Sequence, residues 1–138
     1  MAAVSTLFFL SPLLSDDGWD HSAAFSLKKD SWQKIEIHEG ERIHDLKFLW
    51  TLYRSGALVM HVNYENRTFQ PILYTKYGLN TFKIGLFAKA ADASERQTES
   101  PYALIVFRAF DEKRQRAYLD LKIKDYGMSE IFYTEGSK

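Results

Sequence analysis

The stretch LKFLWTLYRSGALVMHVNY, residues 46–64, decides the fold class of this chain. On both sides of its Arg-Ser-Gly segment, large apolar side chains recur at every second position. A period of two is typical of half-buried β-strands, whereas a helix repeats every 3.6 residues. The stretch therefore predicts two antiparallel strands joined by a hairpin, and the length of the hairpin loop sets their register.

The length of the hairpin loop decides whether the apolar side chains of the two strands share one face of the sheet. A two-residue loop would place Trp50 opposite His61 and divide the apolar side chains between both faces of the sheet. A loop of three residues, 54–56, places Trp50 opposite Met60 and puts Gly56 in the left-handed conformation of a G1 bulge. We therefore predict the three-residue loop. Eight apolar side chains then share one face: Leu46, Phe48, Trp50, Leu52, Leu58, Met60, Val62 and Tyr64.

The rest of the chain continues this pattern. Short runs of Phe, Tyr, Leu, Ile and Val alternate with clusters of Gly, Asp, Asn and Ser, which is typical of strands and turns. Further strands are predicted before Leu14, from near Ala23, and at 33–38, 68–75, 82–86, 103–107, 117–123 and 128–134. Pro71 cannot donate a ladder hydrogen bond, so its strand should lie at an edge or break there. Residues 111–114 should form a hairpin loop, and residues 88–101 a long surface loop or a single helical turn.

About eight or nine strands predict an all-β fold, either an antiparallel β-sandwich with a jelly-roll-like order or a closed barrel. The 138 residues, 46% of them hydrophobic, are enough for one domain with its own core. We expect a single β domain spanning residues 1–138.

Composition narrows the functional classes. Eighteen basic residues balance eighteen acidic ones, which argues against nucleic-acid and membrane partners. The absence of cysteine removes disulfides, thiol nucleophiles and Zn-thiolate sites. No Lys or Arg precedes Lys28, so the apolar start is not expected to be a signal peptide. We expect a cytoplasmic protein without a cofactor, and secretion without a cleaved signal is the alternative.

One polar strand face is a candidate ligand site. His61, Asn63 and Arg67 should follow one side of a strand, with Tyr53 on its neighbour, and such side chains suit sugar hydroxyls and the apolar face of a pyranose. The spacing is distantly similar to the galectin pattern, in which His, Asn and Arg alternate along a strand. Two extra residues separate Asn63 from Arg67 here, and no Trp follows Trp50, so the chain is not assigned to that family.

Two clusters are candidate metal sites. The loop sequence DDGWDH supplies Asp16, Asp17 and Asp20 as Ca²⁺ ligands, or it is only a polar turn around Gly18. The segment 36–44 supplies His38 and His44, which a hairpin could bring together, or it is only a charged hairpin tip.

Aromatic side chains are the candidate partner contacts. Ten Phe, eight Tyr and three Trp exceed what a small core requires, so some of them should reach the surface and anchor an interface. We name Trp19, Tyr74, Tyr77 and Tyr126 as candidates, and also expect Tyr133 to be exposed.

These features favour a non-catalytic recognition module that binds a protein, as an inhibitor, immunity protein or assembly subunit would. A carbohydrate-binding lectin and a small metal-dependent or hydrolytic enzyme are the alternatives. Exposed edge strands offer a route to homo-oligomers.

Overall fold

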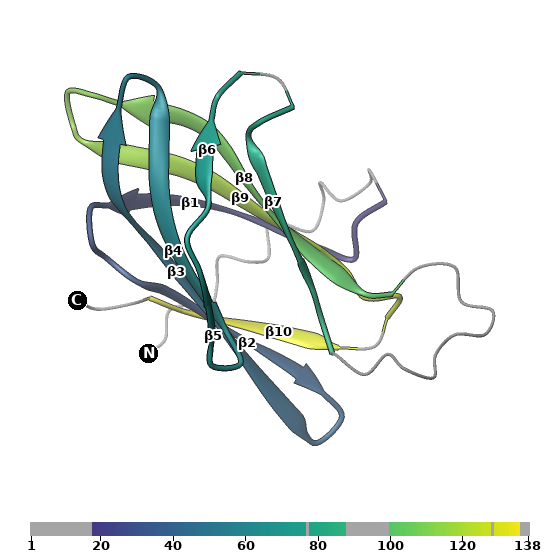
Figure 1. Ribbon diagram of the computed structural model, residues 1–138. Coiled ribbons are helices and arrows are strands. Elements are labelled where there is room, and N and C mark those ends of the chain that lie inside the picture. The colour runs from purple at the N-terminus through teal and green to yellow at the C-terminus, as the bar shows by residue number, and fades with distance from the viewer. Residues whose placement is uncertain (1–17, 77, 88–99, 128, 136–138) are drawn as a thin grey trace.

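The computed structural model describes residues 18–76, 78–87, 100–127 and 129–135, which form two antiparallel β-sheets and no helix (Figure 1). The four-stranded sheet has the order β1-β9-β8-β7, and the six-stranded sheet has the order β10-β2-β3-β4-β5, with β6 also paired to β4. The strands are β1 His21–Lys28, β2 Gln33–Glu39, β3 Arg42–Arg54, β4 Ala57–Tyr64, β5 Arg67–Phe69, β6 Ile72–Tyr74, β7 Thr81–Gly85, β8 Tyr102–Asp111, β9 Arg116–Lys124 and β10 Glu130–Glu135.

The sheets do not close into a barrel, so that alternative is wrong. Each sheet keeps two edges: β1 and β7 in one, and β10 and the β5–β6 pair in the other. Short hairpins join β2 to β3, β3 to β4 and β8 to β9. Such a meander differs from the two Greek keys of a jelly roll, so the predicted jelly-roll-like order is also wrong. No helix among the described residues is long and apolar enough to cross a membrane.

The core is one cluster of buried side chains from the alternating positions of both sheets. Trp50, on the six-stranded sheet, donates an indole hydrogen bond of 2.9 Å to the carbonyl oxygen of Leu27 on the four-stranded sheet. The Tyr53 ring stacks on Phe110 at a centroid distance of 3.8 Å. Burying a large apolar side chain contributes about 1.5–3 kcal/mol, so these inner faces supply the main stabilising term.

The β3–β4 hairpin confirms one prediction and corrects another. Trp50 pairs with Met60, as predicted, but the loop has two residues, because Arg54 pairs with Ala57. Ser55 and Gly56 have φ values of 53° and 85°, the signature of a type I′ turn.

A bulge between Trp50 and Leu52 takes up the odd residue, so the long apolar stretch stays inward without a three-residue loop. Beyond the bulge, the β3 positions that would have faced inward face outward, and the reverse. Leu52 is exposed, and Tyr53 packs against the core.

Most other predicted strands are confirmed. The segment containing Pro71 breaks into β5 and β6, both at the edge of the six-stranded sheet. Residues 103–107 lie in β8, between β9 and β7. Residues 1–14, where a first strand was predicted, and 88–99 of the predicted loop lie outside the described residues.

The turn assignment leads to a stability prediction. A type I′ turn requires positive φ at Ser55, and asparagine adopts this conformation more readily than serine, whereas a β-branched residue resists it. We expect Ser55→Asn to raise the free energy of unfolding by roughly 0.5 kcal/mol and Ser55→Val to lower it by roughly 1 kcal/mol, measured by urea unfolding. Equal stability of the two variants would contradict the two-residue turn.

Candidate functional site

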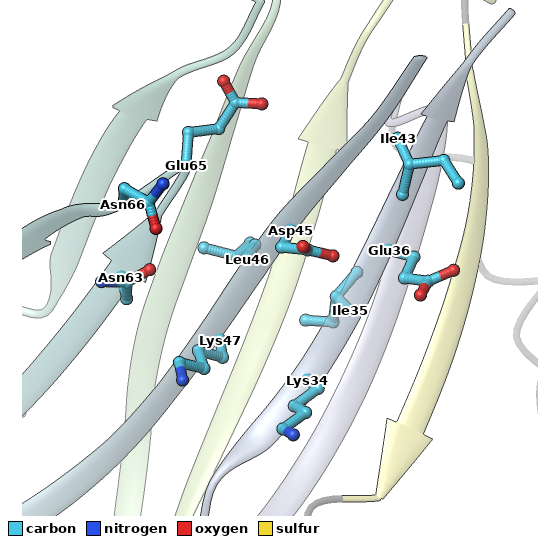
Figure 2. A pocket seen from close by; sticks show the side chains of 10 residues that line it. All are labelled: Lys34, Ile35, Glu36, Ile43, Asp45, Leu46, Lys47, Asn63, Glu65 and Asn66. Carbon is cyan, nitrogen blue, oxygen red and sulfur yellow. The ribbon is translucent and has the colours of Figure 1, made fainter. Parts of the chain in front are cut away.

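The outer face of the six-stranded sheet is the candidate site. A depression of about 720 Å³ lies on it, across β2, β3 and β4 (Figure 2). Ten residues line the depression: Lys34, Ile35, Glu36, Ile43, Asp45, Leu46, Lys47, Asn63, Glu65 and Asn66. Most of these side chains are polar or charged, so the depression suits a polar or charged ligand group.

The strand register places like charges opposite each other in this depression. Lys34 on β2 pairs directly with Lys47 on β3, and Glu36 pairs directly with Asp45. Figure 2 shows the two pairs on the same two strands, with the Ile35–Leu46 pair between them. Like charges directly opposite each other destabilise a sheet. Among the described residues, Lys34, Lys47 and Asp45 have no salt bridge, and the one salt-bridge partner of Glu36 is His38, at 2.9 Å.

Exposed apolar side chains flank the depression on the same face. The alternation of the strands turns five of them outward. Ile43 and Phe132 lie toward the β2–β3 hairpin, where the Phe132 ring contacts the His38 ring at 4.3 Å. Leu52, Ile72 and Tyr74 lie toward the other end of the sheet, where Leu52, Val59 and Ile72 form one continuous rung across β3, β4 and β6.

The turn at one side of the depression is held from within. Glu65 and Asn66 both have positive φ, 50° and 68°. The buried His44 places Nδ1 against the Glu65 carboxylate and Nε2 at 2.9 Å from Glu39 Oε1. His44 thus ties the β2–β3 hairpin to the β4–β5 turn.

The structure divides the predicted ligand set. His61 and Asn63 lie on the outer face, beside Gln70 at 3.3 Å and Thr68 at 3.1 Å respectively. Arg67 pairs with the inward-facing Tyr64, so it points to the other side of the sheet, over the Phe69 ring.

Tyr53 does not lie beside His61 and Asn63 either, because the bulge in β3 makes its side chain face the core. The four residues therefore do not form one site. Thr68 and Gln70 were missed, because the register of β5 depends on the turn at Glu65 and Asn66.

The two histidines predicted as metal ligands do not converge either. His38 faces outward beside Glu36, while His44 pairs with Ile37 and faces the interior. Asp20 accepts hydrogen bonds from backbone amides, and Asp16 and Asp17 lie outside the described residues. Within the described residues, no group of three or more His, Cys, Asp or Glu side chains could hold a metal ion.

The predicted partner contacts have different positions. Tyr74 and Tyr126 are exposed, Trp19 is half-buried against Tyr102, and Tyr77 lies outside the described residues. Tyr133 was expected to be exposed, but it packs against the core, and burial raises its pKa to about 12.

A buried carboxylate, which the sequence did not reveal, organises the end of β9. Asp125 is fully buried and accepts hydrogen bonds from the Gly127 amide at 2.9 Å and from the Ser129 hydroxyl, and it contacts His21 Nε2 at 3.0 Å. His21 and Ser129 both reach the same carboxylate oxygen, Oδ2, and no hydrogen bond joins them to each other within the described residues. This arrangement differs from a Ser-His-Asp triad, in which the histidine bridges the serine and the carboxylate.

The environment of Asp125 changes its acidity. Burial opposes ionisation, but the hydrogen bonds from His21, Ser129 and Gly127, together with the charge of His21, outweigh burial and lower the pKa of Asp125. His21 lies more than a hundred positions earlier in the chain, so no local sequence pattern could have paired them.

No family model, curated protein or solved structure matches this chain. The function is therefore argued from the residues described above.

The lowered pKa of Asp125 predicts a pH dependence of stability. Ionised Asp125 stabilises the fold above its unfolded pKa of about 3.9, and this contribution is lost as pH falls through the lower folded pKa. We expect Asp125→Asn to lower the free energy of unfolding by about 2 kcal/mol at neutral pH, because buried donors lose their acceptor. The deficit should shrink toward pH 2–3. Urea unfolding at both pH values measures it, and an undiminished deficit at acid pH would contradict the role of the carboxylate.

Proposed function

We propose that this protein is a recognition module that binds a protein partner through the outer face of its six-stranded sheet. One observation carries the proposal: five of the large exposed apolar side chains lie on this face, with Ile43 and Phe132 toward the β2–β3 hairpin and Leu52, Ile72 and Tyr74 toward the other end. Scattered exposed apolar residues are normal on any surface, but a grouping on one face is typical of interaction sites.

The charges of the depression support the same proposal. The Lys34–Lys47 and Glu36–Asp45 pairs lower the stability of the free sheet. A partner that places a carboxylate near the two lysines and a cation near the two carboxylates relieves both repulsions on binding. Such complementarity contributes mainly to specificity and to the rate of association.

The fold suits this role. We infer that the two sheets form an antiparallel β-sandwich, since contacts such as the Trp50–Leu27 hydrogen bond and the Phe25–Phe48 ring pair join their inner faces. A sandwich presents each outer face on a rigid support, and a rigid face pays little conformational entropy on binding.

A comparison of two single substitutions tests the proposal. Phe132 and Tyr126 are both 47% exposed, but Phe132 lies on β10 of the six-stranded sheet, whereas Tyr126 lies in the turn after β9 of the four-stranded sheet. Immobilised wild-type protein is incubated with an extract of the source organism, and retained proteins are quantified by mass spectrometry. We expect the Phe132→Lys variant to retain at least about tenfold less of a protein that the wild type retains. Apolar anchors in interfaces contribute about 1.4 kcal/mol or more, which corresponds to that factor.

Tyr126→Lys is the matched control and should retain that protein. Double substitution of Lys34 and Lys47 by glutamate should weaken retention further and alter its salt dependence. Retention that depends on Tyr126 and not on Phe132 would refute the assignment of the face. Phe132→Lys and Tyr126→Lys should both unfold at the wild-type urea midpoint within error, because these two side chains lie at the surface.

A further inference from the structure

The charge of this protein is balanced in total but not face by face. On the outer face of the six-stranded sheet, three basic side chains, Lys34, Lys47 and Arg54, accompany three acidic ones, Glu36, Asp45 and Glu130. On the outer face of the four-stranded sheet, the register places six basic side chains, Lys28, Lys83, Arg108, Arg116, Lys122 and Lys124, against two acidic ones, Asp111 and Asp120. The four-stranded sheet therefore presents a positive face.

At one end of this face, each of three lysines lies over an aromatic ring. The Lys83 ammonium is 4.3 Å from the centroid of Tyr102, and the Lys122 ammonium is 5.9 Å from the Trp19 ring. The Lys124 ammonium is 5.6 Å from the Tyr126 ring. We call these six residues the lysine–aromatic platform.

The sheet register explains why the platform forms. Tyr102 pairs with Lys124 across β8 and β9, and Gly85, at the end of β7, pairs with Tyr102 on the other side. His21, at the start of β1, pairs with Ile123. The end of β7, the start of β8, the end of β9 and the residues before β1 thus meet at one end of the sheet, where Trp19 contacts Tyr102 edge to face at 5.9 Å.

Within the part of the chain that the structure describes, no salt bridge neutralises the lysines of the platform. Within the described residues, none of the three lysines has a carboxylate oxygen within 4.0 Å of its ammonium. Lys124 donates to the Gly18 carbonyl oxygen at 2.7 Å. The nearby Asp20 carboxylate accepts two backbone amides at 2.8 Å, from Asp125 and Tyr126. No carboxylate of the described residues holds the three ammonium groups in a salt bridge, so an external anion can approach them.

We propose that the lysine–aromatic platform binds single-stranded nucleic acid. Phosphates contact Lys83, Lys122 and Lys124, and unpaired bases stack on the exposed ring of Tyr126 and on Trp19. Proteins that bind single strands combine a positive surface with aromatic side chains on which successive bases stack. Lys122 and Lys124 are two residues apart on one strand, about 7 Å, so they can contact different phosphates.

The chemistry of the platform separates this ligand from two others. Carboxylates of an acidic protein are recognised best by the planar guanidinium of arginine, and the platform contains lysine only. The bases of a duplex are already stacked inside it and cannot reach protein rings on a sheet. Single strands offer both the anions and the free π-faces.

This inference revises an expectation drawn from composition. A net charge of zero argues against nucleic acid only if the charges are mixed evenly over the surface. The fold separates them instead, with the surplus of basic side chains on the four-stranded sheet.

Fluorescence anisotropy with a labelled oligothymidylate tests the proposal on the full chain. We expect saturable binding at low salt that weakens as salt rises, with a slope set by the phosphates neutralised. The double variant Lys83→Gln/Lys122→Gln should weaken binding at least about tenfold and flatten the salt dependence. Tyr126→Ala should weaken binding by about tenfold through lost stacking. Bound bases should also quench tryptophan fluorescence, and Trp19→Phe should abolish that quenching.

The matched control is Lys34→Gln/Lys47→Gln, two lysines on the opposite sheet, which should bind as the wild type does. The proposal is overturned if the oligonucleotide does not bind, if the control loses as much affinity as the platform variant, or if a duplex of equal length binds as tightly. Polyglutamate that competes as well as unlabelled oligothymidylate overturns it in favour of an acidic protein partner.

Discussion

The packing of the two sheets around Trp50 is the constraint on which the rest of the structure depends. The indole belongs to β3 of the six-stranded sheet and is almost fully buried, and its N–H must find an acceptor, since an unsatisfied buried donor costs about 1–3 kcal/mol. The Leu27 carbonyl oxygen of β1 supplies that acceptor. One hydrogen bond thus links the sheets, and the Trp50 ring meets Phe110 edge to face at 5.2 Å.

This demand explains the bulge in β3. With a two-residue turn at Ser55 and Gly56 and regular pairing, Trp50 would face outward. The stabilisation from burying its large apolar surface would then be lost. One extra residue after Trp50 restores its inward position, but beyond the bulge the residues of β3 face the opposite way. Leu52 becomes exposed there and joins the proposed interface, while Tyr53 leaves the surface for the core. The interface on the outer face is in this sense a consequence of core packing.

The two outer faces differ in chemistry although the strands beneath them are alike. The six-stranded sheet carries exposed apolar groups around rungs of like charge, which suits a folded protein partner. The four-stranded sheet carries lysines set over aromatic rings, which suits a flexible anionic strand. The proposed sites belong to different sheets, so neither one needs the other to be occupied.

The sequence by itself determined the all-β class, most of the strands and the break at Pro71, because period-two alternation and proline chemistry act within a few residues. Only the tertiary structure decided the face on which each polar or exposed residue lies. A one-residue change in register moves every side chain of a strand to the other face. For this reason Tyr53 and Arg67 lie on the other face from His61 and Asn63, and His38 and His44 lie on different faces. The Asp125–His21 contact and the lysine–aromatic platform join residues that are distant in the chain, and such pairs form only when the sheets assemble.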